Sequence, residues 1–254
     1  MRVTRCFVPA PLRTGELRLL PAPVARHVAQ VLRAQVGDEL TLFDGRGGEY
    51  PAQIIELGAR AVRVRVEQHH ALERESPVSI TLLQALARTE RMDLIVQKAT
   101  ELGVAAILVW PAERSVARLV GAAVAKRCDH WRAIAIAACE QCGRNRIPRL
   151  ELITGLSSAC TAAATVGALD GKLLLDPEAS ESLAAVLPSG RSADGLERLQ
   201  LLIGPEGGIS PAEFAQAAAA GFRPCRLGPR VLRTETAPLA ALAAIQTLAG
   251  DFRR

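Results

Sequence analysis

The chain has 254 residues, of which 49% are hydrophobic, and it carries a formal net charge of +5. This size and hydropathy allow one large core or two smaller ones, and no apolar run approaches the ~20 residues that span a membrane. The positive charge favours an anionic partner, while six scattered cysteines argue against an exported, disulfide-stapled protein and against a zinc site. We therefore expect a soluble, cytoplasmic protein with no metal centre and no membrane partner.

The first part of the chain, residues 1–73, predicts a small β-rich domain. A short helix is expected at Pro23–Leu32, and Asp44 to Gly48 form a hairpin signal between two strands. Apolar alternation predicts the strands themselves at Leu17–Leu20, Glu39–Phe43, Tyr50–Glu56 and Ala61–Val66. Together these elements suggest a small barrel with one helix, followed by a charged linker at residues 69–77.

From residue 74 to 254, predicted strands and helices alternate, which indicates an α/β domain with a mostly parallel sheet. The strand Ser79–Leu83, an amphipathic helix ending at Gly103 and the strand Val104–Trp110 form one βαβ unit. The remaining predicted elements are a helix at 117–142, strands at Lys172–Leu175 and Leu199–Ile203, and helices at Pro211–Ala220 and Ala237–Leu248.

Two glycine-containing loops near the C-terminus each connect an apolar run to a helix, with LLIGPEGGIS at 201–210 and RLGPRVLRTETAPLAALAAIQ at 226–246. Ser210, Pro211 and Glu213 have the pattern of a capping box, and Thr234 or Thr236 is expected to cap the last helix. Open α/β sheets bind ligands where such loops leave the strand ends.

The kind of ligand is constrained by what these loops contain. A phosphate loop fits poorly, because there is no Gly-Lys-Ser/Thr and Glu206 places a carboxylate where a phosphate would lie. A ligand with cationic character and an adenosine suits the loops better. The alternative is that the glycines serve only as tight connections.

These two loops, with MDLIVQKATELGV at 92–104 and IAIAACEQCGRNRIP at 134–148, resemble the signature blocks of the RsmE-type 16S ribosomal RNA methyltransferases, which belong to the SPOUT class. Residues 27–54 resemble the accessory domain of that family, so the likeness extends from about Arg5 to Phe252. The resemblance implies a PUA-like RNA-binding β-barrel domain at 1–73 and a SPOUT methyltransferase domain with a C-terminal trefoil knot at 74–254.

The same resemblance implies an activity and partners. The activity is S-adenosylmethionine-dependent methylation of N3 of a uridine in 16S rRNA, at position 1498 in standard rRNA numbering, with the 30S ribosomal subunit as partner. The resemblance also implies a homodimer, for which the apolar residues Leu239, Leu242, Ile245 and Leu248 of the last helix are expected to supply surface.

By resemblance, the cofactor pocket is lined by the two loops and a neighbouring strand end. For the four Leu and Ile residues involved, plain strand core is the alternative. The residues are Leu175, Ile203, Gly204, Glu206, Gly207, Gly208, Leu227, Gly228, Leu232, Thr234 and Ala237.

Methylation at N3 requires loss of the imide proton, which spreads negative charge onto O2 and O4 of the uracil. Arg230 and Arg233 are the candidates to stabilise that charge, and a phosphate contact or a salt bridge to Glu235 is the alternative role for them. Glu101 and Glu235 are candidate general bases.

Basic residues in two regions are candidates for RNA contacts, because guanidinium groups bind phosphates. They are Arg5, Arg26, His27, Arg33 and Arg46 in the first domain, and Arg144 and Arg146 in the GRNRIP block. Two other functions stay open: a SPOUT ribose 2′-O-methyltransferase, and a non-catalytic ribosome assembly factor with a vestigial pocket.

Overall fold

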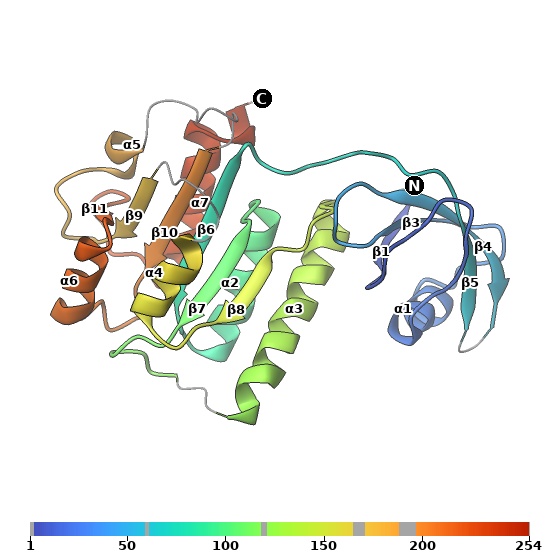
Figure 1. The fold of residues 1–254 in the computed structure, drawn as a ribbon, viewed down its shortest axis with the longest axis horizontal. Coiled ribbons are helices and arrows are strands. Elements are labelled where there is room, and N and C mark those ends of the chain that lie inside the picture. The colour runs from blue at the N-terminus through green and yellow to red at the C-terminus, as the bar shows by residue number, and fades with distance from the viewer. Residues whose placement is uncertain (1–2, 59–60, 118–120, 165–170, 188–196, 254) are drawn as a thin grey trace. The chain divides into compact units, whose positions relative to one another are not determined.

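A computed structural model describes residues 3–58, 61–117, 121–164, 171–187 and 197–253, and the chain divides into two compact units (Figure 1). The N-terminal unit comprises Met1–Glu75 together with Cys139–Ile147, and the C-terminal unit comprises Ser76–Ala138 with Pro148–Arg254. The short segment Cys139–Ile147 therefore packs with residues that lie more than 60 positions earlier in the sequence. Dividing the chain at residue 73 does not anticipate that arrangement.

The N-terminal unit is built on a five-stranded sheet. Its strands are β1 (Thr4–Phe7), β2 (Leu17–Leu19), β3 (Glu39–Phe43), β4 (Tyr50–Leu57) and β5 (Val62–Val66), in the order β1-β3-β4-β5-β2. β1 runs parallel to β3, and the other neighbouring pairs are antiparallel. The predicted hairpin between β3 and β4 is confirmed, whereas β1 was not predicted.

Alternation along β5 shows how the sequence forms this sheet. Val62, Val64 and Val66 are buried in the core of the unit, while Arg63 and Arg65 between them are exposed, as expected for a half-buried strand. The predicted helix at Pro23–Leu32 is present as α1 (Ala22–Arg26) followed by a π-helical turn, η1 (His27–Val31).

The C-terminal unit contains a six-stranded sheet in which every neighbouring pair is parallel, so the predicted α/β class is confirmed. The strands are β6 (Val78–Ala85), β7 (Ala106–Trp110), β8 (Arg149–Leu152), β9 (Gly171–Leu175), β10 (Glu197–Ile203) and β11 (Arg223–Cys225). Their order is β11-β9-β10-β6-β7-β8. The central strand β6 is almost wholly buried along its length, which is typical of a parallel strand covered on both faces.

Helices cover the sheet on both faces (Figure 1). Helix α2 (Thr89–Glu101) packs against α7 (Thr236–Leu248), and α4 (Leu156–Ala164) packs against α6 (Pro211–Ala219). The other helices of the unit are α3 (Ala122–Cys142), whose last turn packs with the N-terminal unit, the short α5 (Leu183–Val186), and a 3-10 turn, η2 (Asp251–Arg253). Among the helices of the described residues, none combines the length and the apolar composition of a membrane-spanning segment.

The start signals of the last two helices have different outcomes. The predicted capping box of α6 is confirmed, with Ser210 and Glu213 exchanging hydrogen bonds. The predicted threonine cap of α7 is wrong, because Glu235 occupies the N-cap position and makes no side-chain cap bond. Thr234 instead donates its hydroxyl hydrogen to the Gly204 carbonyl, 3.0 Å away.

The apolar stripe of α7 is mostly used within the protomer. Leu242 and Ile245 are fully buried, Leu239 is half-buried, and only Leu248 is exposed. The expectation of a free apolar helix face for dimerisation is therefore wrong for most of the stripe.

A candidate ligand cavity at the strand ends

A cavity of about 660 Å³ lies at the carboxyl ends of β9, β10 and β11. Because these strands are parallel, their last residues meet at one edge of the sheet, and β10 lies beside β6, where the strand order changes direction. The volume is in the range of small-molecule and cofactor sites. The residues that line it are Arg91, Leu174, Leu175, Asp176, Pro177, Glu178, Ile203, Gly204, Pro205, Glu206, Gly208, Ile209, Pro211, Phe214, Cys225, Arg226, Leu227, Gly228, Arg230, Val231, Leu232, Arg233, Thr234 and Ala237.

The two glycine loops form adjoining walls and are tied together by hydrogen bonds. The Thr234 hydroxyl bonds to the Gly204 carbonyl, and the buried Gln84 amide donates to the Thr234 oxygen at 3.4 Å. Gly228 has a φ of +109° and Gly208 a φ of +74°, conformations that side chains rarely adopt. The wall therefore depends on local glycine geometry and on one distant glutamine that sequence reasoning missed.

The carboxylate of Glu213 fixes the loop that enters α6. One of its oxygens accepts from the Ser210 amide at 3.0 Å, and the other accepts from the Glu113 amide at 2.7 Å. Glu213 is buried, so these two bonds are shielded from water. The capping box thus joins the loop after β10 to the loop after β7 and holds one side of the cavity in place.

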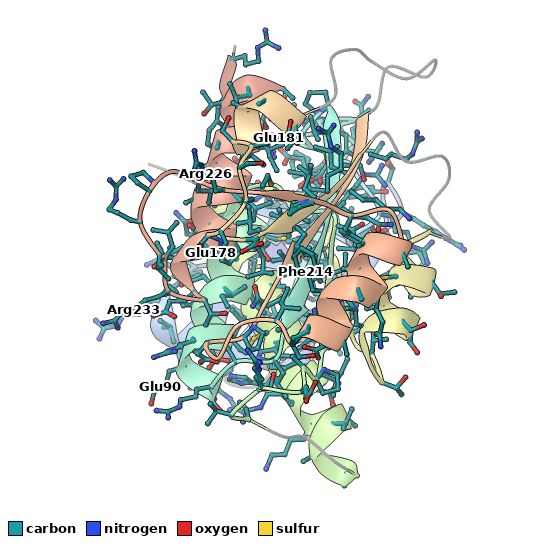
Figure 2. The ribbon with its side chains drawn as sticks, turned by 90° about the vertical axis from the view of Figure 1, so that its left-hand side faces the viewer. Glu90, Glu178, Glu181, Phe214, Arg226 and Arg233 are labelled. Carbon is teal, nitrogen blue, oxygen red and sulfur yellow. The ribbon has the colours of Figure 1, made fainter. Side chains whose placement is uncertain are left out.

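Charged side chains of both signs line the cavity. Figure 2 shows Glu178, Arg226, Arg233 and Phe214, which come from different segments around it. Arg230 and Arg233 are exposed, and neither makes an ion pair with another residue that the structure describes. Cationic groups without an internal partner are available to an anionic substrate.

One arginine of the cavity is engaged differently. Arg91, in the first turn of α2, forms an ion pair of 2.8 Å with Glu206 and one of 3.5 Å with Glu235. Glu206 lines the cavity, whereas Glu235 lies at the N-cap of α7 and does not. The predicted alternative of a salt bridge between Glu235 and Arg230 or Arg233 is wrong, because Arg91 is the partner.

The cavity brings together most of the residues that the sequence predicted. All of the eleven predicted cofactor residues except Gly207 line it, together with Arg230 and Arg233. The Gly207 carbonyl instead accepts from Arg114. Glu101 is paired with Lys98 in the last turn of α2, ten residues or about 15 Å along the helix from Arg91, so its candidacy as a general base is wrong.

Several lining residues were missed by sequence reasoning: Arg91, Asp176, Glu178, Phe214 and Arg226. For Asp176 and Glu178 a signal was available, because Asp-Pro closes the apolar run of β9 as Gly-Pro closes that of β10. Nothing local marks Arg91, since its partner Glu206 lies 115 positions away.

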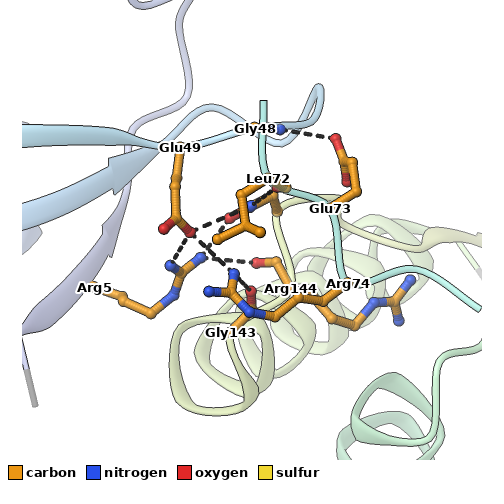
Figure 3. Close-up of polar contacts among 9 residues, drawn as sticks. Arg5, Gly48, Glu49, Leu72, Glu73, Arg74, Gly143 and Arg144 are labelled. Atoms are coloured by element: carbon orange, nitrogen blue, oxygen red, sulfur yellow. Dashed lines mark hydrogen bonds and ion pairs between the residues drawn. The ribbon is translucent and has the colours of Figure 1, made fainter. Parts of the chain in front are cut away.

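The predicted RNA-binding arginines of the N-terminal unit fall into two groups, and Arg5 and Arg144 form the buried one (Figure 3). Arg5 donates to Glu49 at 2.6 Å and to the side-chain amide oxygen, Oδ1, of Asn145 at 2.5 Å. Arg144 donates two hydrogen bonds to Glu75, at 3.0 and 2.5 Å, and Arg144 is only 3% exposed. We therefore revise their interpretation: these charges hold the segment Cys139–Ile147 within the unit and are not free for phosphates.

Glu49 is the centre of this network. Burial by itself raises the pKa of Glu49, but hydrogen bonds from Arg5 and Arg74 outweigh it, so the pKa lies below its ordinary value of 4.5. The carboxylate therefore stays ionised and keeps its two guanidinium partners at neutral pH.

The exposed group contains the other predicted residues. Arg26 and His27 lie where α1 passes into the π-helical turn, and Arg33 follows that turn with a φ of +52°. Arg46 and Arg146 form an isolated antiparallel bridge through their backbones, and both side chains reach solvent. Arg26, His27, Arg33 and Arg46 make no ion pair with another described residue, so they remain available to an external partner. Arg146 pairs with Glu73 at 3.3 Å, but this pair lies at the surface, where an external partner can reach it.

The fold and the cavity define a two-unit α/β protein with a cofactor-sized site at the carboxyl ends of a parallel sheet. Residues 74–246 match the RNA methyltransferase domain family, and residues 20–67 match the RNA methyltransferase PUA domain family. The chain is 35% identical over 242 residues to a protein named ribosomal RNA small subunit methyltransferase E from Mycobacterium bovis, covering 92% of this chain and 88% of that one. The protein of the same name from Bacillus subtilis is 31% identical, with 89% of each chain covered.

Solved structures agree with these relatives. A ribosomal RNA small subunit methyltransferase E from Neisseria gonorrhoeae, bound to S-adenosylmethionine, is 37% identical with a TM-score of 0.87, covering 99% of this chain and all of that one. A Legionella pneumophila protein, described as a methyltransferase in complex with the same cofactor, is also 37% identical with the same coverage, and its TM-score is 0.90. The chain belongs to the ribosomal RNA small subunit methyltransferase E family.

Proposed function

We propose that this chain methylates N3 of a uridine in 16S rRNA, at position 1498 in standard rRNA numbering, with S-adenosylmethionine as methyl donor. The observation that carries the proposal is the cavity formed by two glycine loops at the strand ends. Support comes from relatives named for the small-subunit ribosomal RNA and from similar structures that hold this cofactor.

The cavity suits S-adenosylmethionine in size and in chemistry. Leu175, Ile203, Leu227 and Leu232 offer an apolar surface for an adenine ring, and backbone groups beside them can read its edge. A Cβ on Gly228 would meet no atom within 4 Å, so this part of the cavity wall is open space that a side chain would enter. When bound, the cofactor supplies an electrophilic methyl group on a cationic sulfur, which suits a cavity that also contains carboxylates.

Arg230 and Arg233 are the residues we assign to the uracil. Removal of the N3 proton leaves negative charge on O2 and O4, and guanidinium donors held near those oxygens stabilise it. Both arginines line the cavity, both are exposed, and neither makes an ion pair with another described residue. Glu235 is not assigned as the proton acceptor, because Arg91 engages its carboxylate outside the cavity wall.

We assign RNA positioning to the exposed basic residues of the N-terminal unit: Arg26, His27, Arg33, Arg46 and Arg146. Phosphate contacts of this kind set the register of a substrate without reading its bases. The match of residues 20–67 to a PUA domain family supports the assignment. The 30S ribosomal subunit is the partner we propose, in the cytoplasm.

We further propose a homodimer formed by the C-terminal unit and a trefoil knot formed by the two glycine loops. Support for the dimer comes from exposed apolar side chains on that unit, Leu94, Val231, Leu248 and Phe252, of which Val231 is 79% exposed. Support for the knot comes from the Thr234–Gly204 bond, which holds the later loop against the earlier one. Light scattering that gives a monomeric mass at working concentration would refute the dimer.

The activity is tested by incubating the protein and S-adenosylmethionine with 30S particles that lack the modification, followed by nucleoside mass spectrometry of the rRNA. We expect 3-methyluridine. 2′-O-methyluridine in its place would favour the ribose methyltransferase alternative. Absence of both cofactor binding and methyl incorporation would favour a non-catalytic assembly factor with a vestigial pocket.

A further inference from the structure

The Arg91 ion pairs occupy a position that helix stability does not explain. Arg91 is the third residue of α2, in the first turn, where the helix dipole favours acidic side chains and disfavours a cation. Glu90 beside it has the favourable sign. The reason for an arginine here therefore lies outside the helix, in the two carboxylates that it contacts.

Through these contacts Arg91 joins three segments of the cavity region. Glu206 belongs to the first glycine loop, and Glu235 follows the second loop at the start of α7. The three side chains are only 30%, 20% and 15% exposed, so solvent screens their charges incompletely. One positive and two negative groups leave this cluster with a net charge of −1 beside the cavity.

We propose that the cluster of Arg91, Glu206 and Glu235 sets the charge beside the cavity, so that the chain prefers the cationic sulfonium cofactor to its neutral thioether product; the carboxylates create this preference, and Arg91 is a positioning residue that limits its size. The proposal rests on the proposed function. The guanidinium donates a hydrogen bond to the Glu206 carboxylate and makes an ion pair of 3.5 Å, without a hydrogen bond, with Glu235. Its single positive charge neutralises only one of the two carboxylates. The remaining negative charge attracts a sulfonium, whereas a thioether of nearly the same shape gains nothing from it.

The test compares binding of S-adenosylmethionine and S-adenosylhomocysteine by calorimetry near pH 7.5. The quantity of interest is the ratio of the two dissociation constants. Both ligands carry the same adenosine, carboxylate and amino groups, so damage to the loops weakens both and cancels in the ratio. Only a change of charge near the sulfur alters it.

The net charge of the cluster predicts, for each variant, whether the preference for the sulfonium rises or falls. Arg91→Met leaves −2, so both ligands bind more weakly but the preference for the sulfonium rises about 3- to 10-fold. Glu206→Gln leaves 0, so the preference falls by about the same factor. The double variant Arg91→Met/Glu206→Gln returns to −1, and its ratio should return to within about 2-fold of wild type. Arg91→Lys keeps the charge and the ratio.

Matched controls lie on the same helical turn. Arg88→Met and Glu90→Gln change the same charges on exposed side chains that do not line the cavity, and Glu90 is visible in Figure 2. Both should leave the ratio at its wild-type value. A ratio that is unchanged in Arg91→Met and in Glu206→Gln overturns the proposal, as does a shift of equal size in the controls. If the wild-type protein binds neither ligand, the proposed function itself fails and this inference falls with it.

Discussion

Arginines in the two units of this chain differ in burial and in pairing. In the N-terminal unit, Arg5 and Arg144 are buried against Glu49 and Glu75, and they hold together segments that are far apart in sequence. In the C-terminal unit, Arg230 and Arg233 are exposed at the cavity without an ion pair to another described residue. The comparison teaches that a basic residue indicates a binding surface only after its internal partners are known.

The first prediction concerns the buried arginines. Arg144→Met should destabilise the N-terminal unit by about 3 kcal/mol, because it leaves the Glu75 carboxylate without its guanidinium partner. Urea unfolding followed by hydrogen exchange in β1 and β3 measures the loss. Arg146→Met is the control, since that side chain is 53% exposed, and it should change stability by no more than about 0.5 kcal/mol. Equal effects in the two variants would contradict the structural role.

The second prediction concerns the exposed arginines. Arg233→Ala should slow methyl transfer by about 100-fold, the scale of losing one preorganised donor to a developing anion. Single-turnover kinetics with saturating cofactor isolates this step, and the protein should remain as stable as wild type. Arg223→Ala is the control, because it removes another exposed arginine, one that pairs with Glu181 and does not line the cavity. If Arg233→Ala retained the wild-type rate, its assignment to the uracil would be wrong.

The third prediction compares the same backbone strain at a glycine of the cavity wall and at a glycine of the other unit. Gly228→Ala should weaken S-adenosylmethionine binding by about 10-fold, because a Cβ at φ +109° strains the loop that forms the cavity wall. Gly37→Ala places the same strain, at φ +98°, in the N-terminal unit and should leave binding unchanged. Gly204 is a poorer test, since a Cβ there would approach Ile209 to 2.6 Å and disturb packing.

The smallest effect is a pH dependence of the N-terminal unit. Because the pKa of Glu49 in the folded chain lies below 4.5, its ion pairs contribute full stability above about pH 4.5. That contribution is lost as the pH falls through the depressed folded value. Glu49→Gln should therefore make the stability of β1 less sensitive to acid than in wild type. An identical acid profile in the variant would show that the network does not depend on this charge.

Local signals account for what the sequence predicted well. The two glycine loops, the capping box of Ser210 and Glu213, and the alternation along β5 each involve residues within about ten positions, so their geometry follows from neighbouring residues. These signals were sufficient to predict the parallel sheet and a ligand site at its strand ends, whereas the individual residues of the cavity wall were expected from the family resemblance.

Long-range pairings and short strands account for what was missed. Arg144 meets Glu75 across 69 positions and Arg91 meets Glu206 across 115, so nothing nearby distinguishes them from other arginines. The strand β11 has three residues, Arg-Pro-Cys, and only the cysteine is buried. Such a strand is defined by its parallel pairing with β9 and carries no alternation of its own.

In the function proposed for this chain, the cavity delivers a methyl group to uracil N3. The most direct measurement uses 30S particles carrying a single 2′-deoxyuridine at the target position, with methyl incorporation followed by nucleoside mass spectrometry. Attack by N3 does not need the 2′-hydroxyl, so we predict that the deoxynucleotide is methylated on its base at a rate close to that of uridine. Complete loss of incorporation, with particle binding intact, would contradict the account and identify the ribose as the acceptor.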